Sequence, residues 1–312
     1  NKYLTFPGLM SYLAGIWIIN LNYWGCNQYI TQRALGADLQ TARTGILFAG
    51  FLKLLMPLIV MLPGIAAFVL YENGHLPQLV GGKDGAYSAM LTFLPTGLKG
   101  LSVAALTAAI VASLAGKVNS ISTIYTLDVH KKYIQKNASD NSQVNIGKYA
   151  VFVAMIVAVL FTWDDLLGIG GEGGFTFIQK YTGFISPGVF AMFILGMFWK
   201  RTTGTAAIVG VIAGFVLSIL FNEMAPALFG NETLLYTAYT NGKGGFEIPF
   251  HICMGLSFMF TMLLMVGISL LGPKVNPKAF ELDTEMFKLK PQTTVLIVIT
   301  LLVIFALYVK FW

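Results

Sequence analysis

Residues 44–71 read TGILFAGFLKLLMPLIVMLPGIAAFVLY and contain a single charged side chain, that of Lys53. About 20 consecutive apolar residues cross a bilayer as an α-helix. A membrane β-strand would instead show segments of about 10 residues with alternating hydrophobicity, and this stretch has no such alternation. The stretch therefore predicts a transmembrane helix.

The composition of the whole chain agrees with this prediction. The chain has 312 residues, of which 56% are hydrophobic and 11% charged, and its mean hydropathy is +0.73. A soluble domain carries about 25% charged residues, so this chain cannot cover a soluble surface. The sequence predicts an all-α polytopic membrane protein with eight spans, near 7–30, 44–71, 96–127, 146–167, 174–199, 203–222, 248–272 and 292–311.

The formal net charge of +6 is explained by membrane topology, and no nucleic-acid partner is expected. One set of alternate loops holds twelve basic residues: Arg33, Arg43, Lys131, Lys132, Lys136, Lys148, Lys200, Arg201, Lys274, Lys278, Lys288 and Lys290. The opposite side holds four: Lys2, Lys83, Lys243 and Lys310. Basic loops face the cytoplasm, so both ends of the chain are expected on the outer side of a plasma membrane.

The first span contains an unusual run of polar and aromatic residues, NLNYWGCNQ at 20–28. Asn20, Tyr23 and Asn27 fall on one face of an α-helix, and Gly25 permits local unwinding that frees backbone carbonyls. An amide beside an aromatic ring suits a sugar, because the amide both donates to and accepts from hydroxyls. Equally, asparagines can hydrogen-bond between helices and aromatic rings can lie at the membrane interface.

Lys53 lies near the middle of the second span, where a charged side chain is costly and a functional role is the default expectation. Its ammonium could donate to sugar hydroxyls or pair with an acid outside this chain. Gln179, near the start of the fifth span and four residues after Phe175, is a helix-contact residue or a substrate ligand.

The third span carries a stripe of small residues that includes Ala109, Ala112 and Ser113. Such stripes favour close helix packing. Alternatively, the Ser113 hydroxyl and a nearby carbonyl are hard oxygen ligands that suit Na⁺. Lys117, one turn further on, either extends towards the inner membrane surface or lines a wet inner vestibule. No Walker A, H-E-x-x-H or Cys/His metal spacing occurs, so neither an enzyme nor an organic cofactor is expected.

Together these residues give the chain a resemblance to the sodium/solute symporter family, and within it to bacterial sodium/galactose–glucose cotransporters. The resemblance covers nearly the whole chain. It is carried by the stretches NLNYWGCNQYITQR at 20–33, FLK at 51–53, NSISTIYTLD at 119–128, FIQKYTGFISP at 177–187 and GMFWKR at 196–201.

The resemblance implies a leucine-transporter-like fold with two five-helix repeats of inverted topology. Residues 1–199 would form the second repeat and residues 200–312 three additional C-terminal helices. The first repeat would be a partner segment outside this chain, which agrees with a first residue, Asn1, that is not methionine.

The resemblance also implies roles for individual residues. Asn20, Lys53 and Gln179 correspond to sugar hydrogen-bonding positions, and Tyr23 to an aromatic residue that stacks on the sugar, with Trp24 beside it as part of the gate. Phe175 corresponds to an outer hydrophobic gate. Ala109 and Ser113 fall at Na⁺ positions, through a backbone carbonyl and a hydroxyl respectively.

One departure from the family pattern concerns the ion. Relatives have a Ser–Ser pair where this chain has Ala112-Ser113, so one hydroxyl ligand is lost. The expected function is sodium-coupled symport of a neutral hexose, such as galactose or glucose, by alternating access. The alternatives are a same-fold symporter for sialic acid, proline or pantothenate, and a sugar sensor that does not accumulate its ligand.

Overall fold

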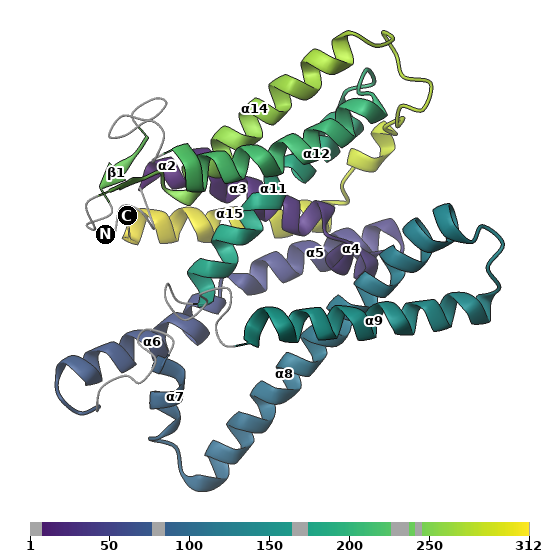
Figure 1. The fold of residues 1–312 in the computed structure, drawn as a ribbon. Helices are drawn as coiled ribbons and strands as arrows, with labels where there is room; N and C mark the ends of the chain where they lie inside the picture. The colour runs from purple at the N-terminus through teal and green to yellow at the C-terminus, as the bar shows by residue number, and fades with distance from the viewer. Residues whose placement is uncertain (1–7, 77–84, 164–173, 226–236, 241–244, 312) are drawn as a thin grey trace. The chain divides into compact units, whose positions relative to one another are not determined.

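The computed structural model describes residues 8–76, 85–163, 174–225, 237–240 and 245–311 (Figure 1). Three of the four lysines assigned to the outer side, Lys2, Lys83 and Lys243, lie outside these residues. Within the described residues, seven helical segments are long and apolar enough to cross a membrane. They are Leu39–Glu72, Thr96–Ile134, Asp140–Thr162, Gly174–Phe198, Gly204–Met224, Phe250–Leu270 and Pro291–Lys310. The predicted all-α polytopic architecture is therefore confirmed.

The first predicted span is a helical segment, residues 9–26, that departs twice from α-helical geometry. It consists of α2 (Leu9–Ser11), a π-helical turn (Tyr12–Ile16), α3 (Trp17–Leu21) and a second π-helical turn (Asn22–Cys26). Asn27 then adopts an extended backbone, with φ −88° and ψ 117°, before α4 (Gln28–Ala34) begins. The α-helical face predicted for Asn20, Tyr23 and Asn27 thus does not continue through Asn27, whereas the predicted local unwinding near Gly25 is present.

The chain packs as two compact units, each described here by itself. The first unit contains Asn1–Thr31 and Phe175–Lys288, and the second contains Gln32–Gly174 and Leu289–Trp312.

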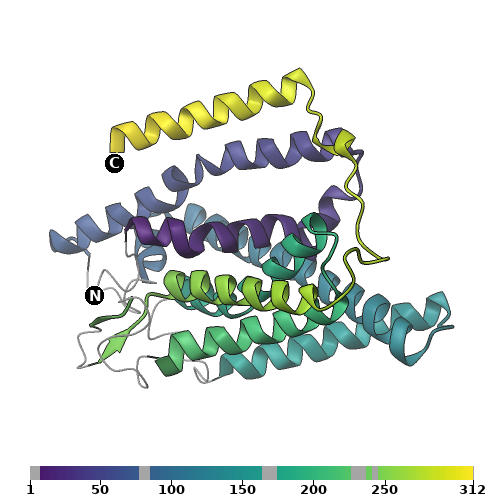
Figure 2. The same ribbon diagram turned by 90° about the horizontal axis from the view of Figure 1, so that it is seen from above.

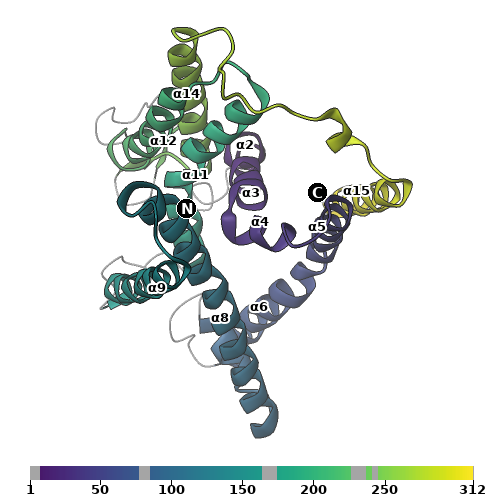
Figure 3. The same ribbon diagram turned by 90° about the vertical axis from the view of Figure 1, so that its right-hand side faces the viewer.

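In the first unit, residues 9–26 lie against α14 (Phe250–Leu270), and α14 lies beside α12 (Gly204–Ile219), as Figure 3 shows. The remaining long helix is α11 (Gly174–Phe198). Trp17 packs edge-to-face on Phe190 and Phe258, with ring centroids 5.8 and 5.3 Å apart. A two-stranded antiparallel pairing of β1 (Tyr239–Thr240) with β2 (Phe246–Glu247) precedes α14.

Glycines allow the helices of the first unit to approach closely. A Cβ on Gly214 of α12 would lie 2.6 Å from the Gly188 Cα of α11, and one on Gly255 would lie 2.8 Å from the Ala14 carbonyl oxygen. Interfaces between membrane helices are enriched in small residues for this reason.

The end of α14 and the start of α12 are joined by polar contacts. Arg201 donates from Nη2 to the Leu270 carbonyl at 2.6 Å and from Nε to the Ser269 carbonyl at 3.3 Å. A guanidinium at a helix C-terminus satisfies carbonyls that have no intrahelical donor. At the start of α12, the Thr203 hydroxyl accepts from the Ala206 amide at 3.2 Å.

The second unit contains α5 (Leu39–Lys53), α6 (Met56–Glu72), α7 (Ala86–Leu91), α8 (Thr96–Thr123) with a π-helical continuation (Ile124–Ile134), α9 (Asp140–Thr162) and α15 (Pro291–Phe311). Helix α15 runs alongside α5, as Figure 2 shows, and α8 packs against α9. A short 3₁₀ helix, Thr284–Phe287, belongs to the first unit. It comes directly before the last segment of the second unit in the sequence.

Two N-caps explain where helices of this unit begin. Asp38 accepts from the Gln40 and Thr41 amides at 3.0 and 3.1 Å, and Ser139 accepts from the Ser142 amide at 3.4 Å. These side chains satisfy amides that the helix itself leaves without acceptors. Because Ser139 caps α9, that helix begins at Asp140, earlier than the predicted start at 146.

Candidate functional site

The polar end of the first helical segment carries Asn20, Tyr23 and Trp24. Asn20 donates from Nδ2 to the Ile16 carbonyl at 2.8 Å, and its side chain is exposed. The Tyr23 and Trp24 rings lie edge-to-face, with centroids 5.9 Å apart and planes at 86°, and Tyr23 is 39% exposed. The two rings therefore present a partly open aromatic surface beside the Asn20 amide.

The backbone around these residues departs from the regular hydrogen-bonding ladder. A π-helical turn spans Asn22–Cys26, and the extended Asn27 ends the segment. Single π turns inside helices are frequent at functional sites, and irregular backbone at membrane depth is tolerated where it is buried in protein or lines a cavity. The backbone at residues 22–27 thus departs from a regular α-helix at the point where the polar and aromatic side chains gather.

Asn22 connects this turn to α11 and was not assigned a role from the sequence. Its Nδ2 donates to Ser186 Oγ at 3.2 Å, and Ser186 Oγ in turn donates to the Thr182 carbonyl at 2.9 Å. Ser186 is 1% exposed. A polar residue in an apolar span was a signal available in the sequence, but its partner lies 164 residues away and could not be read from it.

Phe175 and Gln179 lie one turn apart in the N-terminal part of α11. Phe175 is 73% exposed, and Gln179 is partly buried. Both belong to the same unit as Asn20, Tyr23 and Trp24. The structure therefore places five of the eight predicted site residues in the first unit, on two helical segments joined by the Asn22–Ser186 hydrogen bond.

Lys53 belongs to the second unit and is the last residue of α5. The chain makes a turn at Leu54 and Leu55 before α6 begins at Met56. Pro57 has no amide hydrogen, so it cannot donate to the Lys53 carbonyl four residues earlier. The predicted second span is therefore two helices, and Lys53 lies at their junction.

Ala109 and Ser113 also belong to the second unit and lie one turn apart on α8. They line a groove along α8 together with Ile110, Leu114 and Lys117. Ala109, Ser113 and Lys117 are spaced four residues apart and therefore share one face of this helix.

Asn119 donates from Nδ2 to Gln32 Oε1 at 3.4 Å, which connects α8 to the end of α4. Both residues lie in sequence stretches that carry the family resemblance. Among the described residues, no group of three or more His, Cys, Asp or Glu side chains could hold a metal ion. The predicted ion ligands are instead a carbonyl and a hydroxyl, which are the donor types that a hard monovalent cation accepts.

These features define a multi-pass helical membrane protein with a broken polar helix of the type found in secondary transporters. Comparison with known proteins gives the family. The model of the sodium:solute symporter family matches residues 5–214, and the chain belongs to this family.

Among curated proteins, the chain is 37% identical to the sodium/glucose cotransporter of Vibrio parahaemolyticus, over 100% of this chain and 56% of that protein. It is 34% identical to the human sodium/myo-inositol cotransporter and 33% identical to the canine one, in each case over 83% of this chain and 37% of the relative. The chain thus spans about half or less of the length of these relatives. They are cotransporters, which are transporters and not enzymes.

Proposed function

We propose that the protein containing this chain couples Na⁺ to the transport of a neutral hexose, such as galactose or glucose, by alternating access. The observation that carries the proposal is the π-helical turn and backbone break at residues 22–27, beside Asn20 and the Tyr23–Trp24 ring pair. Family membership and the sodium/glucose cotransporter of Vibrio parahaemolyticus support both the ion and the solute class.

In this mechanism, the amides of Asn20 and Gln179 and the ammonium of Lys53 hydrogen-bond the sugar hydroxyls. The Tyr23 ring stacks on the apolar face of the sugar and closes it from the inside, with Trp24 beside it, while Phe175 covers it from the outside. Amides are suited to this task because each supplies two donors and a carbonyl acceptor. Gln179 is partly buried, which limits competition from water for its amide.

Na⁺ is bound in the proposal by the Ala109 carbonyl and the Ser113 hydroxyl, which line one groove on α8. Because Ala112 supplies no hydroxyl, water would complete the coordination shell. Coupling requires that Na⁺ bind the outward-open state more tightly than the inward-open state, since a ligand with equal affinity for both shifts nothing.

We further propose that residues 1–199 form the second five-helix repeat of a leucine-transporter-like core, with residues 200–312 adding three helices. A repeat is defined by topology and symmetry, so the two packing units do not bear on this division. In this arrangement both chain ends face outward from a bacterial inner membrane, lipid surrounds the helices, and a first repeat completes the substrate cavity.

A cyclic polyol is the second candidate solute, because the chain is also similar to sodium/myo-inositol cotransporters. A cyclic polyol has a hydroxyl on every ring carbon. It can therefore make the same contacts with the amides and the aromatic surface as a hexose. Sialic acid, proline or pantothenate, and a sugar sensor that does not accumulate its ligand, are the further alternatives.

The test uses the full-length protein in proteoliposomes, with radiolabelled galactose, glucose and myo-inositol and with or without an inward Na⁺ gradient. We expect accumulation of a hexose only with the gradient. Competition by unlabelled solutes, including a carboxylate such as sialic acid, ranks the candidates. Binding without accumulation would favour the sensor, and uptake that ignores Na⁺ would refute the assignment of Ala109 and Ser113.

A further inference from the structure

The N-terminal part of α11 is packed differently from the rest of that helix. The buried residues of α11 begin at Gly183 and continue through Leu195, whereas none of residues 174–182 is buried. Phe175 and Gln179 both lie in this less packed part. Contacts of this part with other segments therefore bear on where the two side chains lie.

At Gly183, α11 is fixed firmly to its neighbours. A Cβ on Gly183 would lie 2.5 Å from Met254 Cε of α14. The Ser218 hydroxyl of α12 is 3.5 Å from the Gly183 carbonyl and donates to Ser257 Oγ at 3.1 Å, and both serines are fully buried. Three helices thus meet at one buried polar junction. It lies next, along α11, to the N-terminal part that carries Gln179.

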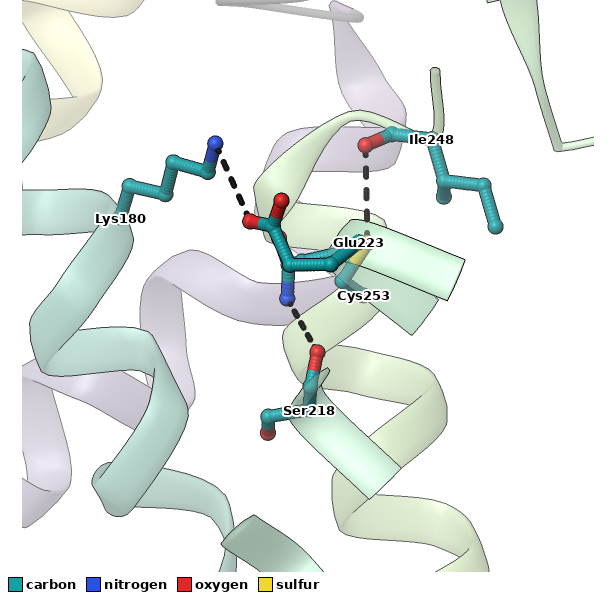
Figure 4. A network of polar contacts seen from close by, with 6 residues as sticks. Lys180, Ser218, Glu223, Ile248 and Cys253 are labelled. Atoms are coloured by element: carbon teal, nitrogen blue, oxygen red, sulfur yellow. Dashed lines mark hydrogen bonds and ion pairs between the residues drawn. The ribbon is translucent and has the colours of Figure 1, made fainter. Parts of the chain in front are cut away.

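On the N-terminal side of this junction in α11, an ion pair joins α11 to the segment that follows α12. Lys180 Nζ lies 3.5 Å from Glu223 Oε1, and Figure 4 shows the two side chains pointing toward each other. The side chains are 22% and 51% exposed, respectively. Lys180 is the residue next to Gln179, so the pair acts on the less packed part of α11.

The two charges are notable for where they occur. Lys180 is the single charged residue in the spanning segment Gly174–Phe198, and Glu223 is the single charged residue in the spanning segment Gly204–Met224. A charged side chain in a membrane span is costly unless it is paired or faces water. Glu223 is the next-to-last residue of its segment and is half exposed, so the pair is expected to contribute modestly to stability and to act mainly on position.

Glu223 lies on the segment that continues α12. It belongs to a π-helical turn, Leu220–Met224, in which the Asn222 side chain donates to the Ser218 carbonyl at 2.8 Å. Ser218 is itself part of the buried junction. The ion pair therefore links the N-terminal part of α11 to a segment that follows directly from this junction.

We propose that the Lys180–Glu223 ion pair positions the N-terminal part of α11, and with it the Gln179 amide, for solute binding. Both are positioning residues, because they act through the helix and touch no solute. The inference rests on the proposed function, in which Gln179 is a solute ligand.

The test reverses the charges one at a time and together in the full-length protein. In proteoliposomes, Lys180→Glu and Glu223→Lys should each raise the KM for the transported solute about three- to tenfold, as expected for loss of one hydrogen bond. The double variant K180E/E223K should restore the KM. The control is Lys310→Glu, which reverses a lysine of α15 that is outside the pair and should leave the KM unchanged.

A second measurement separates positioning from simple stabilisation. The thermal midpoint of each variant in detergent should fall in the single reversals and recover in the double variant if the pair forms. Recovery of the midpoint without recovery of the KM would overturn the positioning role, and single variants with a normal KM would do the same. Absence of sodium-driven uptake by the wild-type protein would overturn the proposed function and this inference together, whereas the other two results leave the proposed function intact.

Discussion

Replacing Gly214 with alanine tests whether the close crossing of α11 and α12 stabilises the first unit. The added Cβ would lie 2.6 Å from the Gly188 Cα and 2.9 Å from its nitrogen. Carbon atoms in contact prefer about 3.5–4.0 Å, so the helices would have to separate by roughly 1 Å. Both clashing atoms belong to the backbone, and no side-chain rotation can relieve the contact.

Overpacking of this kind costs about 1–3 kcal/mol. Alanine in place of a helical glycine recovers at most about 1 kcal/mol through helix propensity. We therefore expect Gly214→Ala to destabilise the protein by ~1–2 kcal/mol. The assay measures the thermal or denaturant midpoint of the purified full-length protein in detergent. Unfolding is monitored by tryptophan fluorescence.

The matched control is Gly196→Ala in α11, where a Cβ would meet nothing within 4 Å. Only the propensity effect remains there, so stability should stay level or rise. The two variants should thus move in opposite directions. Equal midpoints for both would show that the close crossing is not formed, and the argument from helix contact would fail.

Four further predictions concern the proposed sites and a helix cap. Tyr23→Ala should abolish solute uptake while leaving the thermal midpoint near that of the wild type, and near-normal uptake would remove Tyr23 from the site. Ser113→Ala should raise the half-saturating Na⁺ concentration. Lys117→Met should lower it, because a positive charge one helical turn from the proposed site repels Na⁺. An unchanged value in either variant would refute its role. At the start of α5, the hydrogen bond from the Thr41 side chain, together with the backbone amides, lowers the pKa of Asp38 below its ordinary 3.8. A lowered pKa means that the charged cap stabilises the fold above pH 3.8 and is lost as the pH falls below it. The midpoints of wild type and Asp38→Ala, measured from pH 7 to pH 3, should therefore converge at the acidic end, and a constant gap would contradict this reasoning.

Much of the architecture follows from hydropathy, because a bilayer demands long apolar helices. Seven predicted spans correspond to seven apolar helices. The break after Lys53 was missed, since Pro57 is itself compatible with an apolar run and only its missing amide hydrogen signals the interruption. The register of the first span was misjudged beyond Leu21 because a π-helical turn does not follow the α-helical period.

The candidate site was predictable only as residue types. Amides, aromatic rings and hydroxyls in apolar spans are unusual enough to be noticed, and Asn20, Tyr23 and Ser113 were chosen as candidates in this way. Tertiary contacts were not predictable, because periodicity reports the face of a helix and not its neighbour. The Asn22–Ser186 hydrogen bond and the Lys180–Glu223 ion pair both join segments far apart in sequence.

The turn at Leu54 and Leu55 changes the mechanics of the helix pair on either side of it. An uninterrupted helix behaves as one lever, so a tilt at one end is transmitted to the other. Here α5 and α6 meet at a joint where the regular i→i+4 bonding is interrupted. Lys53 therefore stands at a place in this apolar span where the backbone hydrogen bonding changes, and its position depends on the geometry of that turn as well as on the two helices.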